Sequence, residues 1–198
     1  MRIAVEELAN IQTGYQPREG FEPSPEGTHL AIQAKDIDNE NDHVLVVSHL
    51  DKIVATRDFS PYVVNNGEVL FLARGRRRSA TLVEGLPAAI PAIAWYYFFI
   101  LRLKTELVDP AFLAWVINEA EAQDYLEKVA TGTGIPFVTK QFFGALKIEL
   151  PPLEIQAQII RLHRLGRRES FLRRQLERKR SELVRSVCRM LHHGQEQT

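Results

Sequence analysis

Short apolar runs separated by turn-forming residues fill the first three quarters of the chain. Five runs rich in β-branched or aromatic residues are expected to form strands: Leu30–Ile32, Val44–Val47, Glu68–Ala73, Ala92–Leu103 and Leu146–Leu150. Asn65-Asn66-Gly67 predicts a tight turn before the third run. The segment from Tyr15 to Thr28 is rich in Pro, Gly and Glu and predicts a surface loop.

One helix is predicted within this part of the chain. Asp109 suits the N-cap position and Pro110 suits the first turn. Apolar residues then recur at helical spacing, at Phe112, Leu113, Val116 and Ile117. The Gly- and Pro-containing segment Thr131–Pro136 ends the helix. Together these elements predict a mixed α/β (α+β) globular domain over residues 1–150.

From residue 151 to residue 192 the pattern changes to one long helix. The sequence Leu150-Pro151-Pro152-Leu153 stops the preceding strand, and no proline follows it. A helix of about 35–40 residues is roughly 50–60 Å long, which is longer than a domain of this size is wide. Residues 193–198 are expected to form a polar tail.

The apolar residues of this helix form a narrow stripe. They fall at steps of three, four or seven, at Ile155, Ile159, Leu162, Leu165, Leu172, Leu176, Leu183, Val187 and Met190. This width is typical of a seam between two helices. The alternatives are a helix packed on its own domain and a helix lying on a membrane surface. We favour a coiled coil with a partner helix, from either a second copy or another protein, with Ile159, Leu162, Leu172, Leu176, Leu183 and Val187 in the seam.

The formal net charge of zero hides two oppositely charged parts of the chain. Residues 154–198 contain 11 Arg or Lys and 5 Asp or Glu, a net charge of +6, which leaves −6 on residues 1–153. This asymmetry favours a nucleic-acid or protein partner.

Positive charge in the acidic part is concentrated in one arginine loop, Arg74-Gly75-Arg76-Arg77-Arg78-Ser79, directly after a predicted strand. Four neighbouring guanidinium groups repel one another unless an anion is near. Arginine offers a planar fork that suits phosphate and guanine edges, and Gly75 permits close approach of the backbone. We interpret this loop as a DNA contact that reads bases and holds phosphate. A solvated hairpin tip is the alternative.

Motifs of catalysis and cofactor binding are missing from the sequence. There is no phosphate-cradling Gly-Lys-Ser/Thr loop and no glycine-rich dinucleotide motif. The six histidines are scattered, and Cys188 has no acidic or histidine partner in register on its helix. The Pro-Pro motif of amino-methyltransferases is matched only superficially, since the polar first residue and the aromatic fourth are absent. We expect no catalytic residue, no cofactor and no metal.

Export and membrane signals are also missing. The N-terminus is acidic where a secretion signal is apolar, and the single cysteine fits a reducing compartment. The most apolar stretch, Ala88–Leu103, contains Pro91 and Arg102 and is shorter than the roughly 20 residues of a spanning helix. We expect a cytoplasmic protein without a membrane partner.

Several segments, taken in order, resemble the target recognition domain of type I restriction-modification specificity (S) subunits. They are Val5–Gly14, Ile32–Ile37, Tyr62–Leu70 with Ala73–Gly75, and Thr131–Pro136 followed by Leu146–Gln156. The last pair is similar to the family's "Gly-Thr … Leu-Pro-Pro-Leu-x-x-Gln" ending, and the long helix resembles its spacer. The segments cover nearly the whole chain.

The resemblance implies a non-catalytic subunit that reads double-stranded DNA and scaffolds the methyltransferase (M) subunit and, with it, a restriction (R) subunit. The residues expected to face DNA are Tyr15, Gln16, Lys35, Arg74, Arg76, Arg77, Arg78 and Thr133. The usual member has two recognition domains and two spacer helices, whereas this chain has one of each. We therefore expect a half-length form whose two copies read a bipartite inverted repeat.

Two alternatives remain open at this point. The first is an interaction or regulatory fragment that has lost DNA reading and exchanges with a full-length specificity subunit. The second is a fragment of a nuclease or methyltransferase, which the missing catalytic motifs disfavour.

Overall fold

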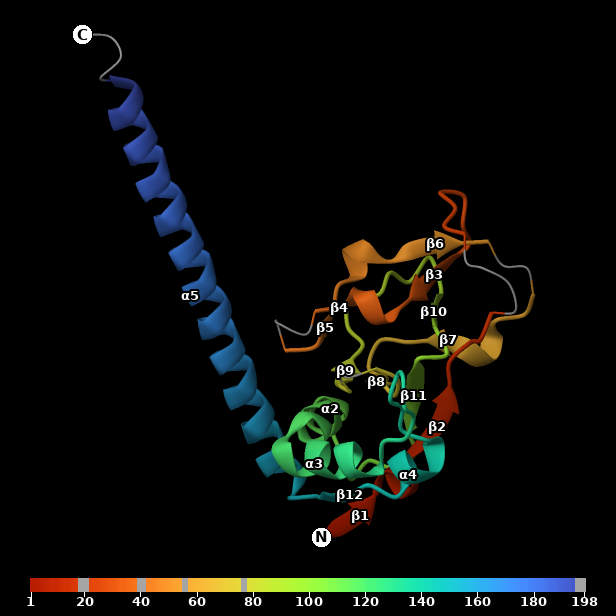
Figure 1. Cartoon of the computed structure of the whole chain (residues 1–198). Coiled ribbons are helices and arrows are strands. Elements are labelled where there is room, and N and C mark those ends of the chain that lie inside the picture. Colours follow the sequence, from red (N-terminus) through yellow and green to blue (C-terminus); the bar gives the residue numbers. More distant parts are fainter. Residues whose placement is uncertain (18–21, 39–41, 55–56, 76–77, 195–198) are drawn as a thin grey trace. The chain divides into compact units, whose positions relative to one another are not determined.

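The chain divides into two units, which we call the body, Met1–Ile160, and the helical segment, Arg161–Thr198. The structure, a computed structural model, describes residues 1–17, 22–38, 42–54, 57–75 and 78–194, without the side chains of residues 191, 193 and 194. All strands of the described residues belong to the body (Figure 1).

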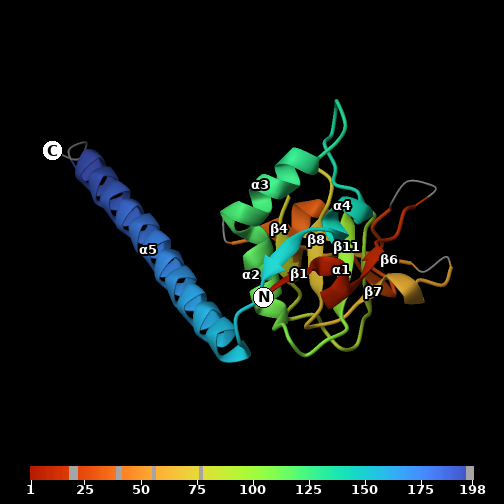
Figure 2. The same cartoon turned by 90° about the horizontal axis from the view of Figure 1, so that it is seen from below.

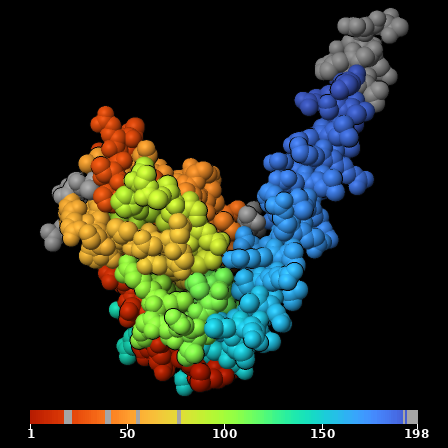
Figure 3. Space-filling model, turned by 180° about the vertical axis from the view of Figure 1, so that it is seen from behind, coloured from red at the N-terminus to blue at the C-terminus, as the bar shows by residue number. Residues whose placement is uncertain are grey.

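The first of two four-stranded sheets in the body has a mixed arrangement. Its order is β6 (Asp51–Ile53), β3 (His29–Ile32), β10 (Ala92–Ala94) and β7 (Val63–Val64). Strand β10 pairs parallel with β3 and antiparallel with β7. In Figure 3 the light-orange surface of the segment around β7 lies beside the yellow-green surface of the segment that leads into β10. Strand β10 itself is buried and pairs with β7, although about 30 residues separate the two strands in sequence.

The second four-stranded sheet is antiparallel. Its order is β2 (Ala9–Thr13), β11 (Phe98–Leu103), β8 (Val69–Leu72) and β9 (Ala80–Leu82). Two smaller antiparallel pairs accompany it: β1 (Arg2–Ala4) with β12 (Lys147–Glu149), and β4 (Ile37–Asp38) with β5 (Val44–Leu45).

Among the described residues, four short helices lie in the body and one long helix begins there. They are α1 (Val5–Leu8), α2 (Pro110–Asn118), α3 (Ala120–Val129), α4 (Lys140–Gly144) and α5 (Leu153–Gly194). The described residues also form 3-10 turns at Ala34–Asp36, Val47–His49 and Ser60–Tyr62. Figure 2 shows α3 and α4 joined by a loop that extends beyond both helices.

Strands β8 and β11 lie at the centre of the body and are buried on both faces. Side chains alternate along β8, so Phe71 faces the core shared with the helices and Leu70 faces the core between the two sheets. Phe71 stacks on Phe143 of α4, with ring centroids 4.1 Å apart. Burial on both faces explains why β8 and the first part of β11 are continuous apolar runs. A third, aromatic cluster that includes Tyr15, Phe59 and Trp95 packs around Ala31 of β3 and Ile93 of β10.

Most predicted strands of the body are confirmed. Strands β8 and β12 fall within the predicted runs, and β3 begins one residue before its run. Gly67 in the predicted turn has a φ of 91° that suits glycine. The prediction for Val44–Val47 was too long. Strand β5 ends at Leu45, because a 3-10 turn begins at Val47.

The prediction of one strand over Ala92–Leu103 was wrong, because the run forms β10 and β11 in different sheets. The N–H of Trp95 donates to the Ile32 carbonyl in the first sheet, 3.0 Å away. The turn Tyr96–Tyr97 then reverses the chain, and the N–H of Phe98 donates to the Trp95 carbonyl at 2.9 Å. An apolar run is compatible with either sheet, so its sequence does not mark the crossing.

The predicted helix start at Asp109 is confirmed. The Asp109 carboxylate accepts hydrogen bonds from the backbone N–H groups of Ala111 and Phe112 at 2.7 and 3.1 Å. The pattern predicted one continuous helix up to Thr131, and that prediction was wrong. Glu119 is extended, with a ψ of 155°, and separates α2 from α3.

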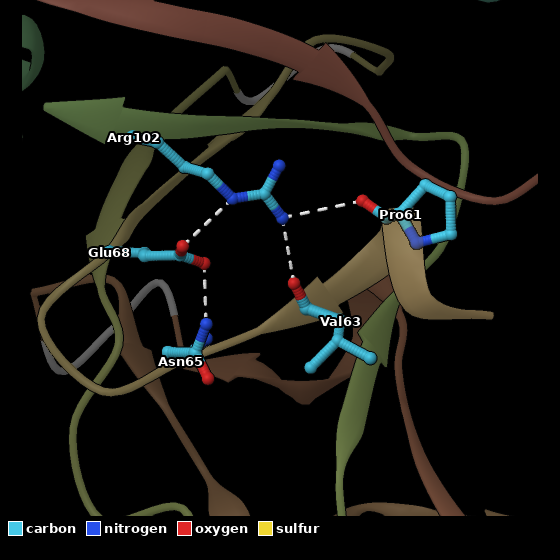
Figure 4. Close-up of polar contacts among 5 residues, drawn as sticks. All are labelled: Pro61, Val63, Asn65, Glu68 and Arg102. Carbon is cyan, nitrogen blue, oxygen red and sulfur yellow. Dashed lines mark hydrogen bonds and ion pairs between the residues drawn. The ribbon is translucent and has the colours of Figure 1, made fainter. Parts of the chain in front are cut away.

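One half-buried arginine joins the two sheets (Figure 4). Arg102 of β11 donates to the Glu68 carboxylate at 2.9 Å, to the Val63 carbonyl at 2.8 Å and to the Pro61 carbonyl at 3.3 Å. The other Glu68 oxygen accepts from the Asn65 N–H at 3.0 Å. Arg102 is therefore committed to structure, and it ties β11 to the segment that leads into β7.

The start of α5 is anchored to the body by Gln156, which is fully buried. Its amide donates to the carbonyls of Leu107 and Pro151 at 2.9 and 2.8 Å, and its oxygen accepts from the Asp109 N–H at 2.9 Å. The predicted long C-terminal helix is confirmed, and it has 42 residues. Within the described residues no helix combines the length and the apolar content needed to cross a bilayer.

Candidate nucleic-acid interface

Arg74, the first residue of the arginine loop, is exposed directly after β8. Its guanidinium carbon lies 5.3 Å from the ring centroid of Tyr96 and 5.3 Å from that of Phe137. We call these three residues the Arg74 stack. Within the described residues no acidic side chain pairs with Arg74, so its charge is available to a ligand.

The other arginines of the loop are placed less fully. Arg76 and Arg77 lie outside the described residues. Arg78 is half-buried, and its Nε atom has no hydrogen-bond partner within the described part of the chain. Ser79 is buried within the body. Among the described residues of the loop, Arg74 is therefore the exposed one.

The α3–α4 connection is held beside Arg74 by backbone hydrogen bonds. The backbone groups of Thr131 and Phe137 donate to each other at 2.9 Å, and the Gly75 N–H donates to the Pro136 carbonyl at 2.9 Å. Gly75 has a φ of 121°, a conformation that side chains oppose. Thr133 is exposed within this connection. The structure thus brings Thr133 and Arg74, two residues predicted to face DNA, into neighbouring loops.

The β10–β11 turn connects this region to the end of β2. The N–H of Tyr96 donates to the Tyr15 carbonyl at 2.8 Å, and the N–H of Ala73 donates to the Tyr97 carbonyl at 2.8 Å. Hydrogen bonding with Tyr96 raises the pKa of Tyr97, and burial adds to the effect, so Tyr97 is protonated at neutral pH. One rigid turn therefore positions both the Tyr15 backbone and the Arg74 stack.

Tyr15 and Gln16 have different environments. Tyr15 is only 8% exposed, and its ring packs on Phe59 and Trp95 with centroids 4.9 and 5.5 Å away. Arg57 lies over the Tyr15 ring at 5.7 Å. Gln16 is exposed. Tyr15 is therefore a packing residue, and its fixed position places the exposed Gln16 next to it at the surface.

Gly14 explains why the chain approaches β10 so closely at this point. A Cβ atom on Gly14 would lie 2.2 Å from the Trp95 carbonyl oxygen and 2.6 Å from the Ala94 carbonyl oxygen. The Tyr15 N–H donates to the same Ala94 carbonyl at 2.8 Å. Only glycine permits this contact without moving the backbone.

Lys35 is exposed but already paired. Its ammonium lies 2.6 Å from the Asp51 carboxylate, which also accepts from Gln33 at 3.2 Å. This hydrogen bond raises the pKa of Lys35. Burial raises the pKa of its neighbour Asp36, which is fully buried and accepts from the Gln33 N–H at 2.8 Å. Lys35 thus lacks the free charge that distinguishes Arg74.

Leucines of the helical segment are exposed at the positions predicted for the seam. Leu162, Leu176 and Leu183 are 70%, 71% and 65% exposed, whereas Ile159, at the end of the body, packs on the body core. Leu172 and Val187 are also exposed. The predicted seam is therefore uncovered from Leu162 onward.

A model of the type I restriction modification DNA specificity domain matches residues 3–177, nearly nine tenths of the chain. The chain belongs to this family. It is also 39% identical over 62 residues to the type I restriction enzyme MjaVIII specificity subunit of Methanocaldococcus jannaschii, covering 31% of this chain and 14% of that subunit.

Solved specificity subunits have the same fold as this specificity-domain protein. The S subunit from M. genitalium matches with a TM-score of 0.53 and 15% identity over 82% of this chain and 37% of that one. The HsdS subunit of Thermoanaerobacter tengcongensis matches with a TM-score of 0.60 and 20% identity over 88% and 39%.

A chain from a study of complex assembly and conformational transition in the type I restriction-modification system matches with a TM-score of 0.66 and 20% identity over 93% of this chain and 43% of that one. The specificity-domain protein thus spans less than half of each solved chain and a smaller part of the curated subunit.

Two residues of the Arg74 stack were not predicted from the sequence of this specificity-domain protein. Tyr96 lay within a predicted strand and no prediction was made for Phe137, so neither had a reason to meet Arg74. Tyr96 stands within five consecutive aromatic residues, Trp95–Phe99, and nothing local distinguishes it from the other four. Across the described residues no three His, Cys, Asp or Glu side chains gather into a group that could hold a metal.

Proposed function

We propose that this chain is the DNA-recognition subunit of a type I restriction-modification system and that the loops around the Arg74 stack contact the DNA. The observation that carries the proposal is Arg74 itself, an exposed guanidinium that pairs with no carboxylate among the described residues and lies in a part of the chain with a net charge of −6. A cationic loop in an otherwise acidic domain attracts an anionic or acceptor-rich ligand most strongly at that spot.

The proposed contact surface combines residues from three connections. Arg74 and the remaining arginines, Arg76, Arg77 and Arg78, come from the loop after β8. Thr133 comes from the α3–α4 connection and Gln16 from the end of β2. Tyr15 is buried beneath this surface and packs on Phe59. Lys35 would join the surface by breaking its ion pair with Asp51.

We further propose that the apolar stripe of α5 pairs with the same stripe of a second copy. Leucines that are about two-thirds exposed cannot gain stability from the helical segment itself, and burying one contributes roughly 1.5–3 kcal/mol. A two-fold seam of this kind places two reading bodies at a fixed separation, as an inverted bipartite DNA site requires. The M subunit, and with it the R subunit, would assemble on this frame.

A second function is compatible with the same stripe. The chain spans 37–43% of the solved chains it resembles, so its helix could cover the matching helix of a longer specificity subunit. Such a fragment would exchange with that subunit without reading DNA. Light scattering on the pure chain separates the two functions, because a reading homodimer has twice the mass of the 22.6 kDa chain and an exchanging fragment is a monomer.

Gel-shift assays with the cognate methyltransferase test the DNA-reading proposal. Replacement of Arg76 and Arg77 by alanine should reduce discrimination between cognate and unrelated DNA by about 1–3 kcal/mol for each arginine that reads a base. Arg2→Ala is the matched control, because Arg2 is an exposed arginine paired with Glu121 on another element. Unchanged sequence-specific binding after both loop substitutions would remove Arg76 and Arg77 from the proposed surface.

A further inference from the structure

The Arg74 stack has the construction of a base reader. Resting on the proposed function, we propose that Arg74 reads a guanine in the major groove and that Tyr96 and Phe137 are the positioning residues that fix its guanidinium. The evidence is the placement of one cation at 5.3 Å from two aromatic rings at the exposed end of a strand.

The first step of the inference is the rigidity of the platform. Phe137 is fixed by a backbone bridge to Arg74 and by two hydrogen bonds with Thr131. Tyr96 is fixed by its N–H bond to the Tyr15 carbonyl and by ring contact with Tyr97, whose centroid lies 4.0 Å away. Neither ring belongs to a free loop end, so both hold their places before any ligand binds.

The second step concerns what such a platform does to an arginine. A guanidinium between aromatic rings keeps its full charge and its five N–H donors but loses rotational freedom. Phosphate binding gains little from a fixed plane, because phosphate oxygens accept from many directions. Guanine gains more, because its O6 and N7 acceptors lie in one plane and match the arginine fork.

The third step is the contrast with the other candidate cations. Lys35 is paired with Asp51, and Arg102 donates its hydrogen bonds to Glu68 and two backbone carbonyls. Arg57 lies over one ring only, that of Tyr15. Among these described residues Arg74 combines exposure, free charge and a ring on each of two neighbouring elements.

A double-mutant cycle between protein and DNA tests the proposal. The complex of wild-type chain and methyltransferase binds its site with each guanine replaced in turn by 7-deazaguanine, which lacks the N7 acceptor. One replacement should weaken wild-type binding about 10- to 100-fold and weaken Arg74→Ala binding no more than about twofold. Tyr96→Leu should lose most of the same discrimination, and Tyr96→Phe, which keeps the ring, should retain it.

The outcomes separate the inference from the function on which it rests. Equal losses at every guanine in both proteins, with a salt slope lower by about 1 for Arg74→Ala, would identify a phosphate contact and overturn the guanine assignment. If the Tyr96→Leu variant still discriminates guanine from 7-deazaguanine and its thermal unfolding temperature is unchanged, the positioning role of Tyr96 is overturned. Absence of any sequence-specific binding by the wild-type complex would overturn the proposed function and the inference together.

Discussion

The body and the helical segment of this chain handle apolar residues in opposite ways. In the body, β8 and β11 bury consecutive residues on both faces, and Leu70 and Phe71 are inaccessible to solvent. In the helical segment, Leu162 and Leu176 are about 70% exposed. The difference indicates that the body is stabilised by its own contacts, whereas the helical segment exposes an apolar stripe, which we propose a second helix covers.

The difference also separates two roles within one family fold. The body presents polar and charged loops at the ends of strands, where rigid neighbours position them. The helical segment exposes apolar residues that recur along a long helix. In the function proposed above, the body recognises DNA and the helix sets the separation and symmetry of two copies.

The largest predicted effect is a loss of stability in the body. Phe71→Ala should lower the free energy of unfolding by about 3–5 kcal/mol, because Phe71 is fully buried and stacked on Phe143. Phe142→Ala is the control, since that ring is 42% exposed and should cost below about 1 kcal/mol. Urea denaturation followed by circular dichroism measures both, and equal costs would mean that the described core is misassigned.

The next largest effect is a loss of self-association through the helical segment. Leu176→Glu should weaken self-association at least about 100-fold, because two-fold symmetry places two unpaired carboxylates in an apolar seam. Ser181→Glu adds the same charge off the stripe and should change association less than about threefold. Sedimentation equilibrium gives both constants. A dimer that survives Leu176→Glu would locate the contact elsewhere, and unfolding of the body should be unaffected by either change.

A smaller effect concerns the junction between the two regions. Gln156→Ala should lower the free energy of unfolding of the body by about 2 kcal/mol, because it leaves two carbonyls and one N–H without partners. Gln158→Ala, an exposed neighbour on the same helix, should cost less than about 0.5 kcal/mol. Chemical denaturation distinguishes them, and similar values would show that Gln156 does not anchor α5.

The smallest effect is a pH dependence within the body. Burial raises the pKa of Asp36 in the folded state above its unfolded value, so its contribution to stability is present at low pH and is lost as pH rises through the folded pKa. Asp36→Asn should remove this loss and make the body slightly more stable than wild type near pH 7. Thermal melts at pH 4 and pH 7 measure the slope, and an unchanged slope would assign it to other groups.

The sequence predicted local elements well where one local rule decides them. The capping carboxylate of Asp109, the turn at Gly67 and the length of α5 all follow from short patterns, and the structure has them. The seam residues were also identifiable from spacing, although their pairing stays a prediction.

Arrangements that depend on distant residues could not be predicted in this way. The division of Ala92–Leu103 depends on Ile32, which accepts the hydrogen bond of Trp95 in another sheet. The side chain of Asn118 exchanges two 2.8 Å hydrogen bonds with the Ala80 backbone and so completes the edge of β9. Nothing near Asn118 in sequence indicates that partner.

The candidate site shows the same limit. Arg74 was predicted to face DNA from the chemistry of its arginine loop and Thr133 from family resemblance, 59 residues apart, and the structure places their loops side by side. Of the two rings that contact Arg74, Tyr96 comes from a turn within an apolar run and Phe137 from the α3–α4 connection. Residue type indicated which side chains could read DNA, and tertiary contacts decide which of them is held rigidly enough to do so.

The account makes one central claim, that two identical reading bodies are joined by a helical seam. Its most direct test is to map methylated sites by single-molecule sequencing in a host that lacks other specificity subunits and expresses this chain with its cognate methyltransferase. The account predicts a bipartite motif whose two halves are inverted repeats. A motif with two unrelated halves, or no methylation in the presence of both proteins, would contradict it.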